Sequence, residues 1–178
     1  MAITISAPHF KESVDDPNIK PFLTQLESFL DLKTIPHYIV KGTSLKTMLD
    51  LTTSEARGTS YNQELAAYLQ VSDLHLELHA YDFDTHEDWS TSDLVIGKLL
   101  GYTDEELLGD FENVLGASAT VETNMVVPMG HYASALSEFV YQIPSIVLYV
   151  NVDSSQLYPS ITESITDIIL DYAESRTS

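Results

Sequence analysis

The residues best suited to chemistry lie in the stretch 73–88, where histidines and acidic residues alternate with leucines and aromatic residues. If residues 74–81 form a strand, His75, Glu77 and His79 project from one face and the leucines project from the other. Two imidazoles and a carboxylate are suitable ligands for a borderline divalent metal such as zinc. This stretch is therefore the first candidate for a metal site.

The loop expected after this strand adds Asp82, Asp84 and His86. A metal held by histidine and carboxylate with one open position activates water for hydrolysis. In this interpretation a divalent metal is the cofactor, and either Asp82 or Asp84 is a ligand or the base. The candidate metal ligands are His75, Glu77, His79, Asp82 and His86.

A second interpretation needs no cofactor. The same alternation is typical of a half-exposed strand, with Leu74, Leu76 and Leu78 in the core. Neighbours on one strand face stand about 7 Å apart, so the three polar side chains cannot hold one ion without curvature or another segment. We then expect them to face solvent, a groove or a partner. Burying all three would cost several kcal/mol unless each found a hydrogen-bond partner.

Several catalytic motifs are absent from the sequence. There is no G-x-S-x-G, no Walker A loop, no G-x-G-x-x-G and no H-E-x-x-H. The chain also has no cysteine, which excludes disulfides, thiolate nucleophiles and thiolate metal sites. Any metal would therefore depend on histidine and carboxylate ligands.

The elements that must position these residues alternate between strand and helix patterns. About five strands and about seven helices indicate one domain over residues 1–178 with a mixed α/β fold, either α+β or layered α/β. We expect strands at Ala2–Ser6, Pro36–Val40, Leu74–Tyr81, Val121–Val127 and Ser145–Val150, the last buried on both faces. We expect one helix from Thr91 or Ser92 to Gly101, and a second that begins at a capping box formed by Thr103 and Glu106. Two more helices are expected, one over His131–Tyr141 and one that begins at Pro159 or Ser160.

The net charge of −19 is the strongest feature of the composition. It argues against direct binding to nucleic acid and against docking on an anionic membrane. No apolar run is long enough to span a bilayer, and the start of the chain does not resemble a signal peptide, so we expect a cytoplasmic protein. The acidity indicates either adaptation to high salt or a functional acidic face. Twelve acids against Lys98 alone, over residues 73–112, would suit such a face.

Two short phrases resemble known proteins. Leu99–Gly109 resembles the helix-turn-helix phrase of PAS sensor domains, but the flanking segments lack the PAS pattern, and we interpret the match as coincidental. Residues 97–102, followed by an acidic helix, resemble a phrase in uncharacterised proteins of halophilic archaea. That resemblance implies a halophilic source and carries no activity or site.

The sequence favours a salt-adapted cytoplasmic accessory or interaction protein, with room for a protein partner and no catalytic signature. One alternative is an acidic mimic of nucleic acid that inhibits a DNA- or RNA-handling protein. The other is the metal-dependent hydrolase built on the histidines and carboxylates of residues 75–86.

Overall fold

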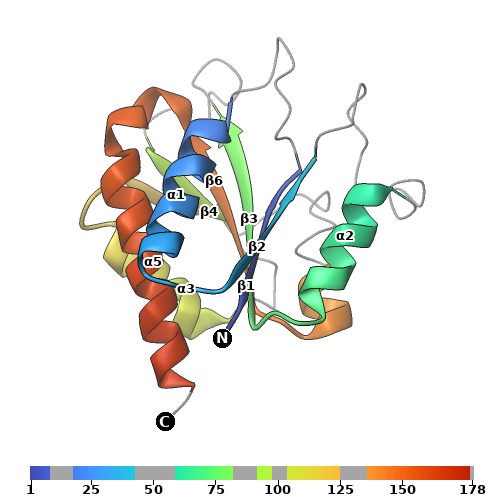
Figure 1. Ribbon diagram of the computed structural model, residues 1–178. Helices are drawn as coiled ribbons and strands as arrows, with labels where there is room; N and C mark the ends of the chain where they lie inside the picture. Colours follow the sequence, from blue (N-terminus) through green and yellow to red (C-terminus); the bar gives the residue numbers. More distant parts are fainter. Residues whose placement is uncertain (9–17, 43–58, 82–91, 98–103, 125–135, 177–178) are drawn as a thin grey trace.

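The computed structural model describes residues 1–8, 18–42, 59–81, 92–97, 104–124 and 136–176, which form one sheet with helices on both faces (Figure 1). The strands are β1 (Ile3–Ala7), β2 (His37–Lys41), β3 (Leu74–Tyr81), β4 (Leu94–Gly97), β5 (Val121–Asn124) and β6 (Ser145–Asn151). The helices are α1 (Lys20–Leu32), α2 (Ser60–Leu69), α3 (Glu105–Leu115), the π-helix η3 (Leu136–Tyr141), the 3-10 helix η4 (Val152–Leu157) and α5 (Tyr158–Ser175).

The sheet has six strands in the order β2-β1-β3-β6-β4-β5. The four strands β2, β1, β3 and β6 run parallel, so their carboxyl ends meet at one edge. We call this edge the carboxyl edge. Strand β4 pairs antiparallel with β6, and β5 pairs parallel with β4. The mixed α/β fold is confirmed. The sheet has six strands, one more than the five that the sequence predicted.

The missed strand is β4, whose residues were expected to belong to a helix from Thr91 or Ser92 to Gly101. All four residues of Leu94–Gly97 are buried, and the strand lies between β6 and β5. A four-residue apolar run fits a helical and an extended period equally well. Pairing with β6 on one side and β5 on the other decides in favour of the strand. Residues 98–103 lie outside the described residues.

Helices cover the two faces of the sheet unequally. In Figure 1, α1, α3 and α5 lie together on one face, and α2 lies on the other. Helix α2 is capped by Thr59, whose side chain accepts from the backbone N–H of Asn62. Helix α3 is capped by Asp104, so the capping box expected at Thr103 is wrong. No helix in the described part of the chain is both long and apolar enough to cross a membrane.

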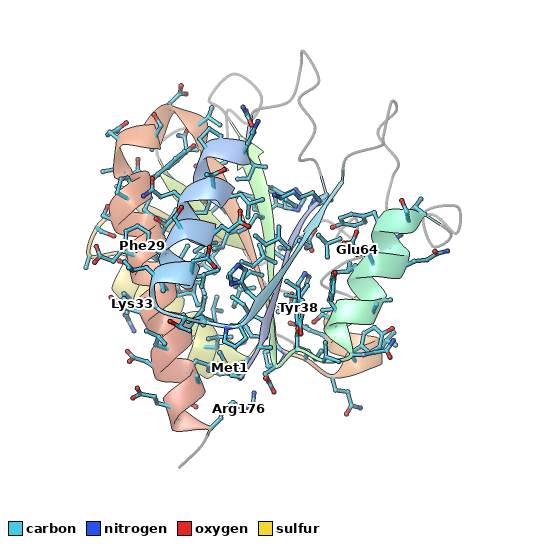
Figure 2. The ribbon with its side chains drawn as sticks, in the orientation of Figure 1. Met1, Phe29, Lys33, Tyr38, Glu64 and Arg176 are labelled. Atoms are coloured by element: carbon cyan, nitrogen blue, oxygen red, sulfur yellow. The ribbon has the colours of Figure 1, made fainter. Side chains whose placement is uncertain are left out.

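The main core lies between the sheet and the three helices α1, α3 and α5. The even-numbered leucines of β3, Leu74, Leu76 and Leu78, are fully buried there, as the alternation predicted. Phe22 of α1 meets Tyr158 of α5 edge to face, with ring centroids 5.1 Å apart. Figure 2 shows α1 and α5 side by side, and Lys33 at the end of α1 reaches Asp167 of α5 at 3.6 Å.

Gly42 closes β2 where no side chain fits. A Cβ at this position would lie 1.8 Å from the carbonyl oxygen of Pro8. The Gly42 backbone N–H also donates to the carbonyl of Ala7. The ends of β1 and β2 are therefore held together at the carboxyl edge by a contact that only glycine permits.

Asp93 joins β4 to two other parts of the fold. Its carboxylate accepts from the Ser154 hydroxyl at 2.5 Å, and from the Thr120 backbone N–H at 2.8 Å and hydroxyl at 2.6 Å. Partial burial works against ionisation, but these hydrogen bonds outweigh it and hold the pKa of Asp93 below its ordinary value. The ionised carboxylate therefore stabilises the folded chain.

Asp93→Asn is expected to lower the free energy of unfolding at pH 7 by about 1 kcal/mol. Because the folded pKa lies below the unfolded value, this contribution is complete above that unfolded value and is lost as pH falls through the folded pKa. The gap between wild type and variant should therefore close below about pH 4. Urea titrations at pH 7, 5 and 3 measure it, with exposed Asp110→Asn as the control. A gap that stays constant with pH would contradict this account.

Candidate functional site

A row of polar side chains lies on the sheet face that α2 covers, where an apolar layer would be the ordinary outcome. We call it the polar layer, and its members are Thr4, Ser6, His75, Glu77, His79, Ser145 and Tyr149. All seven are buried. Strand pairing sets their places, because His75 is level with Ser145, Glu77 with Ser6, and His79 with Tyr149. The layer runs from near the amino ends of β1, β3 and β6 toward the carboxyl edge.

His75 is held between two hydroxyl groups. Its Nε2 lies 2.8 Å from Oγ of Ser6, and its Nδ1 lies 3.0 Å from Oγ of Ser145. Burial lowers the pKa of His75 to about 4, although the charge of Glu77 opposes the shift. The ring is therefore neutral at pH 7, with one nitrogen donating to a hydroxyl and the other accepting from one. Both nitrogens are used within the fold.

Glu77 and His79 form a buried pair on β3. Oε1 of Glu77 lies 2.8 Å from Nε2 of His79, and the side chains are 1% and 9% exposed. The imidazole of His79 also stacks on Tyr149, with ring centroids 4.9 Å apart and planes 21° from parallel. A hydrogen bond and a stacked ring together restrict the orientation of His79.

Glu77 is the electrostatic centre of this layer. Burial raises the pKa of Tyr149 and Tyr61, and the charge of Glu77 raises both further. Tyr61 comes from the first turn of α2, and its buried hydroxyl lies close to Ser6 and Glu77. Both phenols therefore remain protonated donors beside the carboxylate at neutral pH. Figure 2 shows the face that α2 covers, with Tyr38 of β2 and Glu64 of α2 on it.

The prediction that His75, Glu77 and His79 face solvent, a groove or a partner is wrong, because all three are buried within the chain. The helix α2 covers their face, and each has a hydrogen-bond partner that offsets the cost of burial. The three do not form a metal site together, since no three His, Asp or Glu side chains in the described ranges are gathered closely enough to hold an ion. The other candidates, Asp82, Asp84 and His86, lie outside the described residues.

Beyond the polar layer, the carboxyl edge carries a second set of polar contacts. The Tyr81 hydroxyl and the Asn151 amide both donate to the carbonyl of Ser92. Tyr81 and Asn151 are the last residues of β3 and β6, and Ser92 precedes β4. These contacts fix the spacing of three chain segments next to His79. The segments that follow β1, β2 and β3 all begin from this edge.

Two hollows lie away from the polar layer. One, of about 440 Å³, is bordered by Asp73, Ile143 and Arg176 among others, and the second, of about 430 Å³, lies beside His37, Lys41 and Glu64. Neither is lined by a member of the polar layer. They provide no access to Glu77 or His79.

Sequence reasoning missed the partners that complete the layer. Ser6 and Ser145 lie 69 and 70 residues from His75 in the chain, and no local pattern connects them. Sequence reasoning also missed a possible pair of metal ligands in the segment after β1. His9 and Glu12 stand three positions apart directly after β1, a spacing that metal-binding histidine–glutamate pairs use, and they lie outside the described residues.

Comparison with known proteins shows the fold. No family model matches the sequence, and no curated protein matches it significantly. The structure resembles the N-acetylmuramoyl-L-alanine amidase AmiC2 of Nostoc punctiforme at 13% identity and a TM-score of 0.59, covering 97% of both chains. It also resembles an N-formylglutamate amidohydrolase from Ralstonia eutropha JMP134, at 12% identity and a TM-score of 0.62, covering 97% of this chain and 93% of that one.

A third similar structure is larger. A metallo-carboxypeptidase from Burkholderia cenocepacia matches at 10% identity and a TM-score of 0.63, covering 98% of this chain and 57% of that one. The chain therefore has the fold of amidohydrolases and metallo-carboxypeptidases. At these identities the likeness establishes the fold and no activity.

This fold corrects the expected function. The prediction of an accessory protein without a catalytic signature is wrong, because the chain shares its fold with proteins named as amidases and amidohydrolases. Composition could not show this, since a surface charge is compatible with any fold. The nucleic-acid mimic rested on the acidic stretch 73–112, in which Glu77 is buried in the polar layer and therefore contributes no surface charge.

Proposed function

We propose that this protein is a metal-dependent hydrolase of amide bonds, with its site at the carboxyl edge of β1, β3 and β6. The fold supports this assignment, since proteins named as amidases, amidohydrolases and carboxypeptidases share it. The observation that carries it to this chain is the Glu77–His79 pair, a buried carboxylate and imidazole on the central strand. In open α/β sheets, ligands bind outside the carboxyl ends of the strands.

The described residues supply one part of a metal site. His79 is the imidazole of the polar layer that lies nearer the carboxyl edge, two residues before the end of β3, whereas both ring nitrogens of His75 bind serine hydroxyls. The remaining donors must then come from outside the described residues, where the sequence offers His9, Glu12, Asp82, Asp84 and His86. A divalent metal in such a site polarises an amide carbonyl and lowers the pKa of bound water.

The surrounding residues suit this use of His79. Stacking on Tyr149 and the contact with Glu77 hold the ring in place, so little ordering is required when a ligand binds. The helix α2 excludes water from the layer beneath, which strengthens electrostatic interactions near the edge. The chain itself therefore provides an imidazole of fixed orientation, and a buried layer beneath it from which water is excluded.

The experiment is metal titration combined with hydrolysis. Chelator-treated protein should take up one equivalent of zinc, manganese or cobalt in calorimetry, and the loaded protein should cleave at least one of N-formyl amino acids, N-acetylmuramoyl-L-alanine or peptide carboxyl-terminal bonds. His79→Gln, which keeps an N–H for Glu77, should weaken uptake more than the roughly 10–100-fold expected of an outer partner.

Two variants sharpen this experiment. His9→Ala should also abolish tight uptake, whereas His37→Ala on the edge strand β2 should leave it unchanged. If wild-type protein binds no divalent metal and cleaves none of these amides, the proposed function is wrong.

A further inference from the structure

We propose that the outer edge of β2 binds an extended basic peptide segment, which adds to the sheet as a further strand. This edge lies between α1 and α2 (Figure 1), and a carboxylate from each helix flanks it. The surface is separate from the polar layer, so the proposal does not depend on the proposed hydrolase activity.

The backbone of β2 turns hydrogen-bonding groups away from the sheet. Strand β2 is the first strand in the sheet order, and among the described residues it pairs with β1 alone. The carbonyl of Pro36 accepts from β1, and the N–H of Gly42 donates to β1. Because backbone groups alternate in direction along a strand, those of His37 and Ile39 point away from β1. Such an edge is a template on which a further strand can form.

The side chains around this edge come from three elements and border one hollow of about 430 Å³. It is lined by Glu27 of α1, by Glu64 of α2, and by His37, Ile39 and Lys41 of β2. Figure 2 shows Glu64 on the side of α2 nearer to β2. The hollow therefore follows the outer side of β2, where an added strand would lie.

An added strand would direct its side chains to two different surroundings. Tyr38 and Val40 face α2, and Tyr38 stacks there on Tyr68 with ring centroids 4.6 Å apart. Ile39 faces the other way and packs against the main core beneath α1. Because side chains on neighbouring strands alternate together, successive residues of the peptide would meet α1 and α2 in turn.

The charges around the edge favour a basic partner. Glu27 lies on the α1 side and the exposed Glu64 on the α2 side, so carboxylates meet both sets of peptide side chains. Asp31, one turn after Glu27, is also exposed, and its carboxylate lies 3.9 Å from Nε2 of His37. Lys41 is the one lysine or arginine among the described residues that line the hollow. The net charge of −19 further attracts cationic segments and speeds their encounter with the edge.

Ile39 adds one apolar position to this pattern. It is half-buried at the centre of β2. A β-branched residue opposite it on the added strand would form a favourable cross-strand pair. The segment that fits is therefore extended, carries lysine or arginine on both faces, and places one β-branched residue on the α1 face.

A second copy of this chain is a poorer occupant of the same edge. Antiparallel pairing of two β2 strands about a two-fold axis at Ile39 would bring each acidic flank against its own copy. The Glu27 carboxylates of the two copies would approach each other, as would those of Glu64. Like charges opposite each other destabilise a strand pair, and the two net charges also repel.

The test uses a synthetic probe, the acetylated and amidated peptide Thr-Lys-Lys-Val-Lys-Lys-Thr, in calorimetry at low ionic strength. The probe should bind the protein one to one. The control peptide carries N-methyl groups on the backbone nitrogens of its central residues, which removes the donors for strand pairing and keeps the charge. It should bind at least about tenfold more weakly. Amide hydrogen exchange of the complex should show new protection at His37 and Ile39.

A pair of double variants tests the flanking carboxylates. Glu27→Gln with Glu64→Gln should weaken binding of the probe by about 2–30-fold, because each removes one exposed ion pair with a lysine. The matched control is Glu106→Gln with Glu163→Gln, which changes the net charge equally at exposed positions of α3 and α5. This control should leave the affinity nearly unchanged.

Four outcomes would overturn the proposal: no binding of the probe, equal binding of the N-methylated peptide, equal weakening by the two double variants, or exchange protection confined to another element. A protein that sediments as a dimer with His37 and Ile39 protected in the absence of peptide would assign the edge to a second copy, and would also overturn it. The two peptides are compared on unaltered protein, so they decide the matter even if a variant does not fold.

Discussion

His79→Leu is expected to lower the free energy of unfolding by about 3–5 kcal/mol. The substitution leaves the carboxylate of Glu77 buried without its imidazole, in a position that is 1% exposed. The stacking contact with Tyr149 is also lost. Urea titration at pH 7 measures the effect, provided that the slope of the transition stays equal to that of wild type.

Two comparisons show whether this loss comes from the Glu77–His79 pair or only from lost packing of the His79 side chain. The double variant Glu77→Leu with His79→Leu removes both polar groups and should recover most of the loss, since an apolar pair avoids the unpaired charge. The deficit of His79→Leu alone should shrink as pH falls, because a protonated Glu77 costs less to bury. A loss below about 1 kcal/mol at pH 7 would contradict a tightly coupled pair.

Phe22→Ala is expected to cost about 3–5 kcal/mol. Phe22 is fully buried between α1 and α5, and its ring meets Tyr158 edge to face. Removing it opens a cavity where the first and last helices join, and it removes an aromatic contact of about 1 kcal/mol. At about 2–4 °C per kcal/mol for a chain of this size, calorimetry should show a large fall in Tm.

The control for Phe22 lies on the same helix. Leu32 is 74% exposed at the end of α1, so Leu32→Ala loses little packing. Its cost should stay within about 0.5 kcal/mol. Similar losses for Phe22→Ala and Leu32→Ala would mean that α1 is not packed on α5 as described.

The fold was predictable where the apolar residues of a whole strand or helix followed one regular spacing. Strand β3 has the predicted bounds, Leu74–Tyr81, because strict alternation fits only an extended chain. Strand β6 is buried throughout, as its almost wholly apolar run indicated. Strand β4 was not predictable, because four apolar residues carry no period of their own and only the pairing with β6 and β5 makes them a strand.

The candidate site was predictable in its residues and not in its environment. The alternation correctly placed His75, Glu77 and His79 on one face of β3. It could not show that α2 covers this face, nor that Ser6 from β1 and Ser145 from β6 would meet His75. Strand order brings these residues together, and strand order depends on pairing energies distributed over the whole sheet.

The strand order also determines when this chain can fold as it leaves the ribosome. Strand β3 lies between β1 and β6, so its second side stays unpaired until residues 145–151 have been made. The helix that packs against α1 follows later still, at residues 158–175. A nascent chain that ends before residue 145 therefore carries a central strand with one open edge, which is a template for aggregation. Folding of this domain must wait until synthesis has nearly passed its last helix.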